Sequence, residues 1–261
     1  MLAHAIVVSR WDYVLAVVVA TMAIPIAYLR HPRWKAFIVT LPFPFTVATL
    51  SVGQPINATH VAGLLVLLAY THGVRLLYQR LRVPIFLAIV LSAAGYCAVG
   101  TIVARLAPKT PAAFWTACAV AGVVAVVCHR ALPPREEPGH RSTLPIWIKA
   151  PLVIVVVGLL VVLKESLQGF MTLFPMVGVF AAYESRHSLW TLCRQIPILT
   201  MLLLPMMVTI YLVQGRIGLG PGLAVGWGVY LIGLAPYMWR LWLSVEKPGR
   251  GAEQEDVGAE G

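Results

Sequence analysis

Long stretches without a charged residue most limit what this chain can fold into. The run Ala36–Val74 holds 39 residues with no Lys, Arg, Asp or Glu, and other uncharged runs cover Tyr13–Leu29, Val83–Ala104 and Thr110–His129. An apolar run of about 20 residues is long enough to cross a bilayer as a helix. Because 59% of the 261 residues are hydrophobic and 11% are charged, too few charges remain to build a water-facing shell. The sequence therefore predicts an all-α, multi-pass membrane protein and excludes a soluble enzyme, a DNA-binding module, a disordered chain and a disulfide-stapled secreted domain.

The uncharged runs, divided at turn-forming residues, predict nine transmembrane helices. These are 13–29, 36–52, 59–77, 83–104, 110–129, 144–163, 168–183, 196–215 and 217–239. They group into an N-terminal anchor helix (1–31), a first unit of four helices (32–130), a polar cytoplasmic linker (131–143), a second unit of four helices (144–243) and an acidic tail (244–261) that we expect to be disordered. The hairpins 36–77 and 144–183 contain short helices with central Pro or Gly residues. Whether these hairpins cross the membrane or re-enter on one side stays open at this point.

The distribution of basic residues predicts the orientation of the helices. With the N-terminus outside, 15 of the 20 Lys and Arg residues fall in cytoplasmic segments and five fall outside. Cytoplasmic loops of membrane proteins carry this excess of basic residues. We therefore expect a cytoplasmic C-terminus and attribute the net charge of +10 to membrane topology, with no nucleic-acid partner.

The two units resemble each other at an offset of about 113 residues. Trp34-Lys35-Ala36 matches Trp147-Ile148-Lys149-Ala150, and Val83-Pro84-Ile85 matches Ile196-Pro197-Ile198. With four helices each, such units have the same orientation, which predicts a parallel repeat.

Small residues recur at every fourth position in the last helix of each unit. They are Ala113, Ala117, Ala121 and Ala125 in the first, and Gly218, Gly222 and Gly226 in the second. Small residues let helices approach closely in lipid, so these stripes indicate either packing within the chain or a homodimer face.

Catalytic motifs are missing from the sequence, which predicts that the chain is not an enzyme. The cysteines form no C-x-x-C pair, and no metal or cofactor is expected. Ionisable residues at membrane depth are the default site candidates. Lys164 and Glu165, with Gln168 one turn on and Arg216 on the same outer side, form a candidate substrate site; the alternative is a solvated turn. Glu184, Arg186 and His187 form a second polar cluster on the inner side.

Prolines inside the predicted helices indicate kinks. They are Pro42, Pro44, Pro175, Pro197 and Pro205. A kink frees backbone carbonyls that must find partners inside the protein, and interrupted helices in a repeat can mark a transport site.

The second unit resembles the GlpM-like small membrane proteins. The resemblance is carried by Ile148-Lys149-Ala150-Pro151, by Leu173-Phe174-Pro175 and by Phe180-Ala181-Ala182-Tyr183. It covers about residues 147–240, with a fainter copy at 34–130, so the chain looks like a tandem pair. The resemblance implies a protein of the bacterial inner membrane that is linked to glycerol-phosphate metabolism and exopolysaccharide production, and it brings no catalytic residues.

Two functions follow as hypotheses. The first is a non-catalytic accessory component of envelope or exopolysaccharide metabolism, which packs in the lipid bilayer against other membrane proteins. The second is a transporter for a small solute or lipid carrier with a site between the repeats.

Overall fold

The computed structural model describes residues 9–29, 32–135, 137, 158, 162 and 166–245, and within them all regular secondary structure is helical. The helices are α1 (Arg10–Tyr28), α2 (Pro32–Thr40), α3 (Phe43–Val52), α4 (Ala58–Arg75), α5 (Ile85–Leu106), α6 (Pro111–Ala131), α8 (Met176–Glu184), α9 (Leu189–Ile217) and α10 (Leu219–Val245). A π-helical turn, η1 (Leu76–Arg80), extends α4, and a 3-10 helix, η2 (Gln168–Leu173), precedes α8.

Six helical segments are long and apolar enough to cross a membrane. They are Trp34–Val52, Ala58–Arg80, Ile85–Leu106, Pro111–Ala131, Leu189–Ile217 and Leu219–Trp239. These segments confirm the prediction of a helical membrane protein with several spans. The predicted helix 144–163 lies outside the described residues, so the total of nine stays a prediction.

Polar side chains fix where several helices begin. Ser9 caps α1 together with Asp12, and Asn57 caps α4 together with His60, because each pair bonds the backbone amides at its helix start. The carboxylate of Glu137 accepts hydrogen bonds from the amides of Trp190 and Thr191, at 3.3 and 2.6 Å. A carboxylate is favourable at a helix N-terminus. This cap explains why α9 begins at Leu189 and not at the predicted residue 196.

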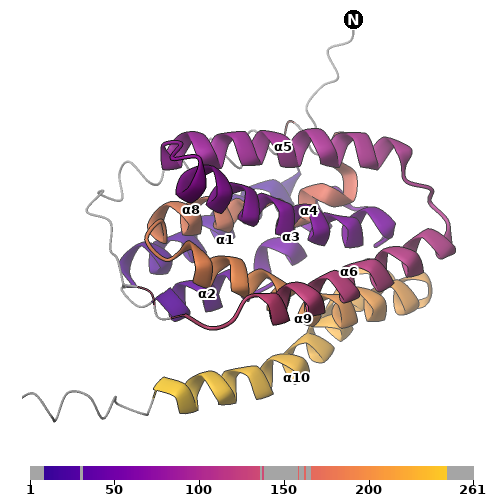
Figure 1. The fold of residues 1–261 in the computed structure, drawn as a ribbon. Helices are drawn as coiled ribbons and strands as arrows, with labels where there is room; N and C mark the ends of the chain where they lie inside the picture. The colour runs from indigo at the N-terminus through magenta and orange to yellow at the C-terminus, as the bar shows by residue number, and fades with distance from the viewer. Residues whose placement is uncertain are drawn as a thin grey trace, which may run out of the picture.

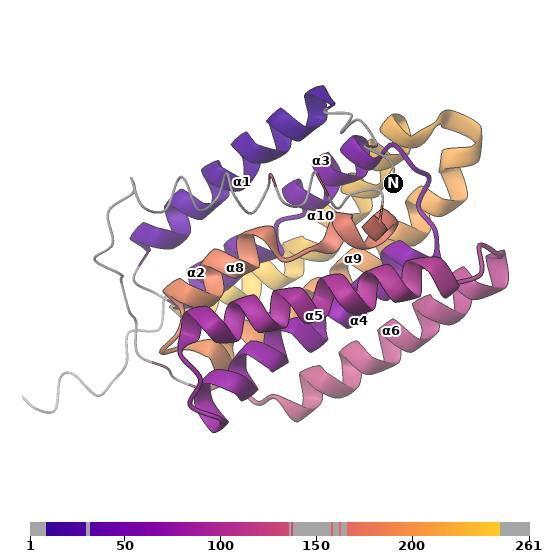
Figure 2. The same ribbon diagram turned by 90° about the horizontal axis from the view of Figure 1, so that it is seen from above.

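Helices α4 and α9 lie at the centre and run antiparallel. The Cys193 thiol, near the start of α9, donates to the Thr71 carbonyl near the end of α4, at 3.4 Å. At the other end, the Gln214 side chain exchanges two hydrogen bonds with the backbone of Ile56, at 2.8 and 2.9 Å. Helix α6 contacts both, while α5 packs on α4 and α10 packs on α9. Figures 1 and 2 place α5 and α10 on opposite sides of the bundle.

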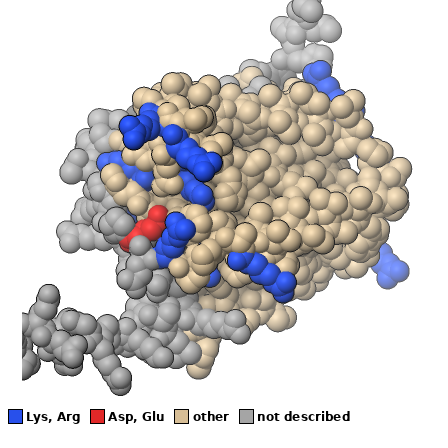
Figure 3. Space-filling view, in the orientation of Figure 1, with Lys and Arg blue, Asp and Glu red and all other residues tan. Residues whose placement is uncertain are grey.

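Basic side chains gather at one end of the molecule, which we call the Arg75 end, as Figure 3 shows. We call the opposite end, with Ile56 and Gln214, the Gln214 end. The Trp190 ring lies between the guanidinium groups of Arg75 and Arg135, at 4.5 and 3.7 Å from the ring centroid. The described basic residues at the Arg75 end are Lys35, Arg75, Arg80, Arg82, Arg130, Arg135, Arg186 and Arg194, and those at the Gln214 end are Arg10, Arg105, Lys109 and Arg216.

Candidate functional site

Two helical segments are interrupted midway by proline. Segment A consists of α2 and α3 with a break at Leu41 and Pro42, and segment B consists of η2 and α8 with a break at Phe174 and Pro175. Proline has no amide hydrogen and its ring clashes with the preceding turn, so a helix does not continue through it. The sequence-based expectation of kinks is thus fulfilled at Pro42, Pro44 and Pro175. By contrast, Pro197 and Pro205 lie inside α9 without ending it.

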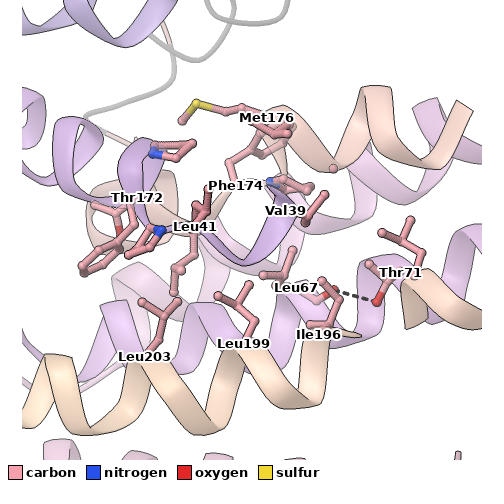
Figure 4. A pocket seen from close by; sticks show the side chains of 18 residues that line it. Val39, Leu41, Leu67, Thr71, Thr172, Phe174, Met176, Ile196, Leu199 and Leu203 are labelled. Carbon is pink, nitrogen blue, oxygen red and sulfur yellow. Dashed lines mark hydrogen bonds between the residues drawn. The ribbon is translucent and has the colours of Figure 1, made fainter. Parts of the chain in front are cut away.

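The breaks of the two segments meet at a cavity of about 60 Å³ (Figure 4). Leu41, Pro42 and Pro44 line it from segment A. Thr172 and Pro175 line it from segment B. Its remaining wall comes from α4 and α9, through Leu67, Thr71, Leu192, Ile196, Leu199 and Leu203. The lining is mainly apolar, and the cavity has room for a solute of a few heavy atoms.

The hydroxyls at the cavity already have hydrogen-bond partners. Thr71 donates to carbonyls of its own helix, at Leu67 and Leu68, and Thr172 donates to the Gly169 carbonyl at 2.7 Å. Figure 4 shows the Thr71 bond as a dashed line. A solute in the cavity must therefore find other polar groups.

Backbone amides supply those groups, because α3 and α8 both begin at the cavity. Among the described residues, the amides of Phe45, Val177 and Gly178 have no hydrogen-bond acceptor. The first turn of a helix leaves its amides unsatisfied and carries a partial positive charge. The cavity can thus receive a solute with an acceptor oxygen.

Tyr70 adds a buried hydroxyl beside the start of α8. Its side chain is 3% exposed, and its hydroxyl has no hydrogen-bond partner within the described part of the chain. A methyl group on Gly178 would stand 4.0 Å from the Tyr70 ring. Tyr70 is therefore a polar group close to the cavity whose hydrogen-bonding capacity is unused.

Buried tyrosines hold the half of each segment that precedes the break. The Tyr230 hydroxyl of α10 donates to the Thr40 carbonyl at 2.5 Å, and the Tyr96 hydroxyl of α5 donates to the Phe170 carbonyl at 2.8 Å. Carbonyls freed by the interruptions thus find partners in the protein interior, as the prolines predicted. Sequence reasoning missed these two tyrosines, because a buried tyrosine looks like an ordinary core residue in a sequence.

The predicted outer site is described only in part. Lys164 and Glu165 lie outside the described residues. Gln168 begins η2 and is half-buried, and Arg216 is exposed near the end of α9. No hydrogen bond or ion pair in the described part of the chain joins Gln168 to Arg216. The neighbouring Gly169 packs against Thr59 and His60, so η2 lies on the start of α4 at the Gln214 end.

The predicted inner cluster divides at the end of α8. Glu184 ends the helix and is 2% exposed, and its carbonyl accepts a hydrogen bond from the ammonium group of Lys35 at 3.0 Å. Arg186 packs on the Tyr183 ring, 5.1 Å from its centroid, and His187 is exposed in the following turn. Glu184 and His187 therefore do not share a helix face.

The stripes of small residues pack within the chain. A methyl group on Gly226 would meet Ile210 of α9 at 2.7 Å, and one on Gly222 would meet Val213 at 3.5 Å. Gly218 has a positive φ of 85° at the start of α10. On α6, which contacts α4 and α9, Ala121 and Ala125 are fully buried, while Ala113 and Ala117 are half-buried.

No group of three or more His, Cys, Asp or Glu side chains within the described ranges is placed to hold a metal ion. No protein-family model matches the chain, and the curated proteins and solved structures contain no match to it. The GlpM-like resemblance therefore stays a prediction.

Proposed function

We propose that the chain is a membrane transporter for a small polar solute, and that the cavity between segments A and B is its binding site. The observation that carries this proposal is the meeting of two interrupted helical segments at one internal cavity. Irregular backbone at membrane depth is tolerated where it is buried in protein or lines a cavity. In transporters, substrate sites are typically built by discontinuous helices near the middle of the membrane.

The chemistry of the cavity limits the solute. A volume of about 60 Å³ admits only a few heavy atoms. The free amides of Phe45, Val177 and Gly178 favour a solute with an acceptor oxygen over a hydrocarbon. Small carboxylates and polyols satisfy both conditions. We also propose that the Arg75 end is cytoplasmic, because basic residues concentrate there.

The accessory role inferred from the GlpM-like resemblance remains the second proposal. Its sequence argument relied partly on the glycine stripe as a contact surface. Gly222 and Gly226 pack on α9, so a partner protein would have to use another face. This loss of a contact surface is why we place transport first.

Osmotic swelling of proteoliposomes tests the proposal. Vesicles containing the chain are diluted into iso-osmotic ammonium acetate, ammonium formate or glycerol, and swelling is followed by light scattering. We expect swelling faster than in empty vesicles for at least one solute. The substitution Leu199→Trp fills the cavity and should lower that rate at least tenfold.

A matched control lies on the same helix. Leu212 is 60% exposed, and Leu212→Trp adds the same group on the outer face of α9, so swelling should be unchanged. Equal swelling of Leu199→Trp and Leu212→Trp vesicles would remove the cavity from the account. Swelling no faster than in empty vesicles with all three solutes would contradict transport of this solute class.

A further inference from the structure

Helix starts repeat along the chain at offsets of 131 to 134 residues, not at the 113 residues that the sequence comparison suggested. Helix α4 follows its cap Asn57, and α9 follows Ser188, 131 residues later. Helix α5 begins at Ile85 and α10 begins at Leu219, 134 residues later. Segment A therefore corresponds to segment B, α4 to α9, and α5 to α10.

Residue identities at the breaks agree with this register. Segment A reads Thr40-Leu41-Pro42-Phe43-Pro44, and segment B reads Thr172-Leu173-Phe174-Pro175. The Phe-Pro pair of the second unit thus has its counterpart at Phe43 and Pro44. Tyr96 and Tyr230 are also equivalent, and both are buried.

The cavity lining contains both members of several equivalent pairs. From the segments come Leu41 with Leu173, Pro44 with Pro175 and Phe45 with Met176. From the central helices come Leu67 with Leu199 and Thr71 with Leu203. A cavity lined in this way lies on the axis that relates the two units.

Aromatic contacts repeat in the same manner. The Tyr96 ring of α5 contacts Phe174 of segment B, with centroids 5.3 Å apart. The Trp227 ring of α10 contacts Phe43 of segment A, with centroids 4.9 Å apart. Each residue of the second pair is offset by 131 from one residue of the first. The contact therefore recurs with the roles of the units exchanged.

The equivalent helices α4 and α9 are antiparallel, because Thr71 is bonded to Cys193 and Ile56 to Gln214. From these observations we infer that the chain consists of two inverted-topology units, and that η2 and α2 are the two gates of the cavity. Each gate is the half of an interrupted segment that precedes its break. This inference rests on the proposed transport function.

Each gate covers a different end of the cavity. Gly169 of η2 packs on Thr59 and His60 at the Gln214 end. Lys35 of α2 bonds the Glu184 carbonyl at the Arg75 end. The tyrosine that holds each gate comes from the other unit: Tyr96 holds η2, and Tyr230 holds α2. Loss of either hydroxyl should therefore open the cavity toward one end only.

Cysteine accessibility in the full chain tests this assignment. Cys97, Cys118, Cys128 and Cys193 are replaced by alanine, and Leu203→Cys places a reporter in the cavity. The membrane-impermeant reagent sodium (2-sulfonatoethyl)methanethiosulfonate is applied to right-side-out and to inverted vesicles. In separate chains, Gln54→Cys and His187→Cys report which end faces the reagent.

Tyr96→Phe should raise the labelling rate of the reporter at least threefold from the Gln214 end and leave the rate from the Arg75 end unchanged. Tyr230→Phe should do the reverse. Tyr13 is 69% exposed, so Tyr13→Phe serves as a matched control that changes neither rate. Tyr-to-Phe changes keep the ring in place, and elution as a single species in detergent verifies folding.

Equal changes from both ends, changes from the same end in both variants, or no change in either variant would overturn the gate assignment. The result is independent of the swelling assay. Opposite labelling changes without swelling would support the gates while the proposed transport of acetate, formate and glycerol fails.

Discussion

Segments A and B make the same crossing with different local chemistry. In segment A both halves are α-helical, with nine residues in α2 and ten in α3, and two prolines enforce the break. In segment B the first half is a 3-10 helix of six residues, and one proline follows it. Segment B enters through Gln168 at a φ of 48° and is pressed onto the start of α4 by Gly169. The position of segment A is therefore encoded locally, whereas that of segment B depends on contacts with distant residues.

The largest expected effect separates the segments at Gly169. A methyl group there would stand 2.8 Å from the His60 amide nitrogen and 2.5 Å from its ring nitrogen, and closer still to the Thr59 hydroxyl. Because the backbone of α4 cannot yield cheaply, Gly169→Ala should cost about 3 kcal/mol, the upper part of the range for overpacking. Thermal unfolding in detergent, followed by tryptophan fluorescence, measures this loss as a lower midpoint.

Gly95→Ala on α5 is the control for Gly169→Ala. Nothing lies within 4 Å of its added methyl group, and alanine is favoured over glycine in a helix by about 1 kcal/mol. Its midpoint should stay the same or rise. If Gly169→Ala unfolds at the same temperature as the unsubstituted chain, segment B is not held by this contact.

A smaller effect separates the prolines of the two segments. Pro175→Ala restores an amide hydrogen and removes a barrier of about 3 kcal/mol to a continuous helix. Segment B should then straighten and narrow the cavity, which lowers proteoliposome swelling several-fold. Pro44→Ala leaves Pro42 in place, so swelling should fall less than twofold. A greater loss in Pro44→Ala than in Pro175→Ala would show that the single proline does not control segment B.

Much of the fold could be predicted from hydropathy and proline positions. The uncharged runs identify membrane helices because helix length and bilayer thickness are linked. Helix bounds were less predictable: α9 extends to Leu189 because the Glu137 side chain, distant in sequence, caps it. The two interruptions follow from Pro42, Pro44 and Pro175, although the same residue type leaves α9 continuous at Pro197 and Pro205.

The candidate site was less predictable, because it contains few ionisable groups. Sequence reasoning gave weight to Lys164, Glu165 and Arg216, since charge is costly in a membrane. The cavity instead offers backbone amides, which every sequence contains. A signal was nevertheless present in the Thr-Leu and Phe-Pro residues shared by the two segments, at an offset that the comparison of tryptophans and tyrosines obscured.

Solute protection is the most direct test of the central claim, that solute binds where the two segments cross. Leu203→Cys in the chain without its four native cysteines is labelled in the presence and absence of the solute that gives the fastest swelling. The account predicts that the solute slows labelling at Leu203→Cys several-fold and leaves labelling at Leu212→Cys, on the outer face of the same helix, unchanged. A solute that crosses the membrane through this chain without protecting Leu203→Cys would contradict the account.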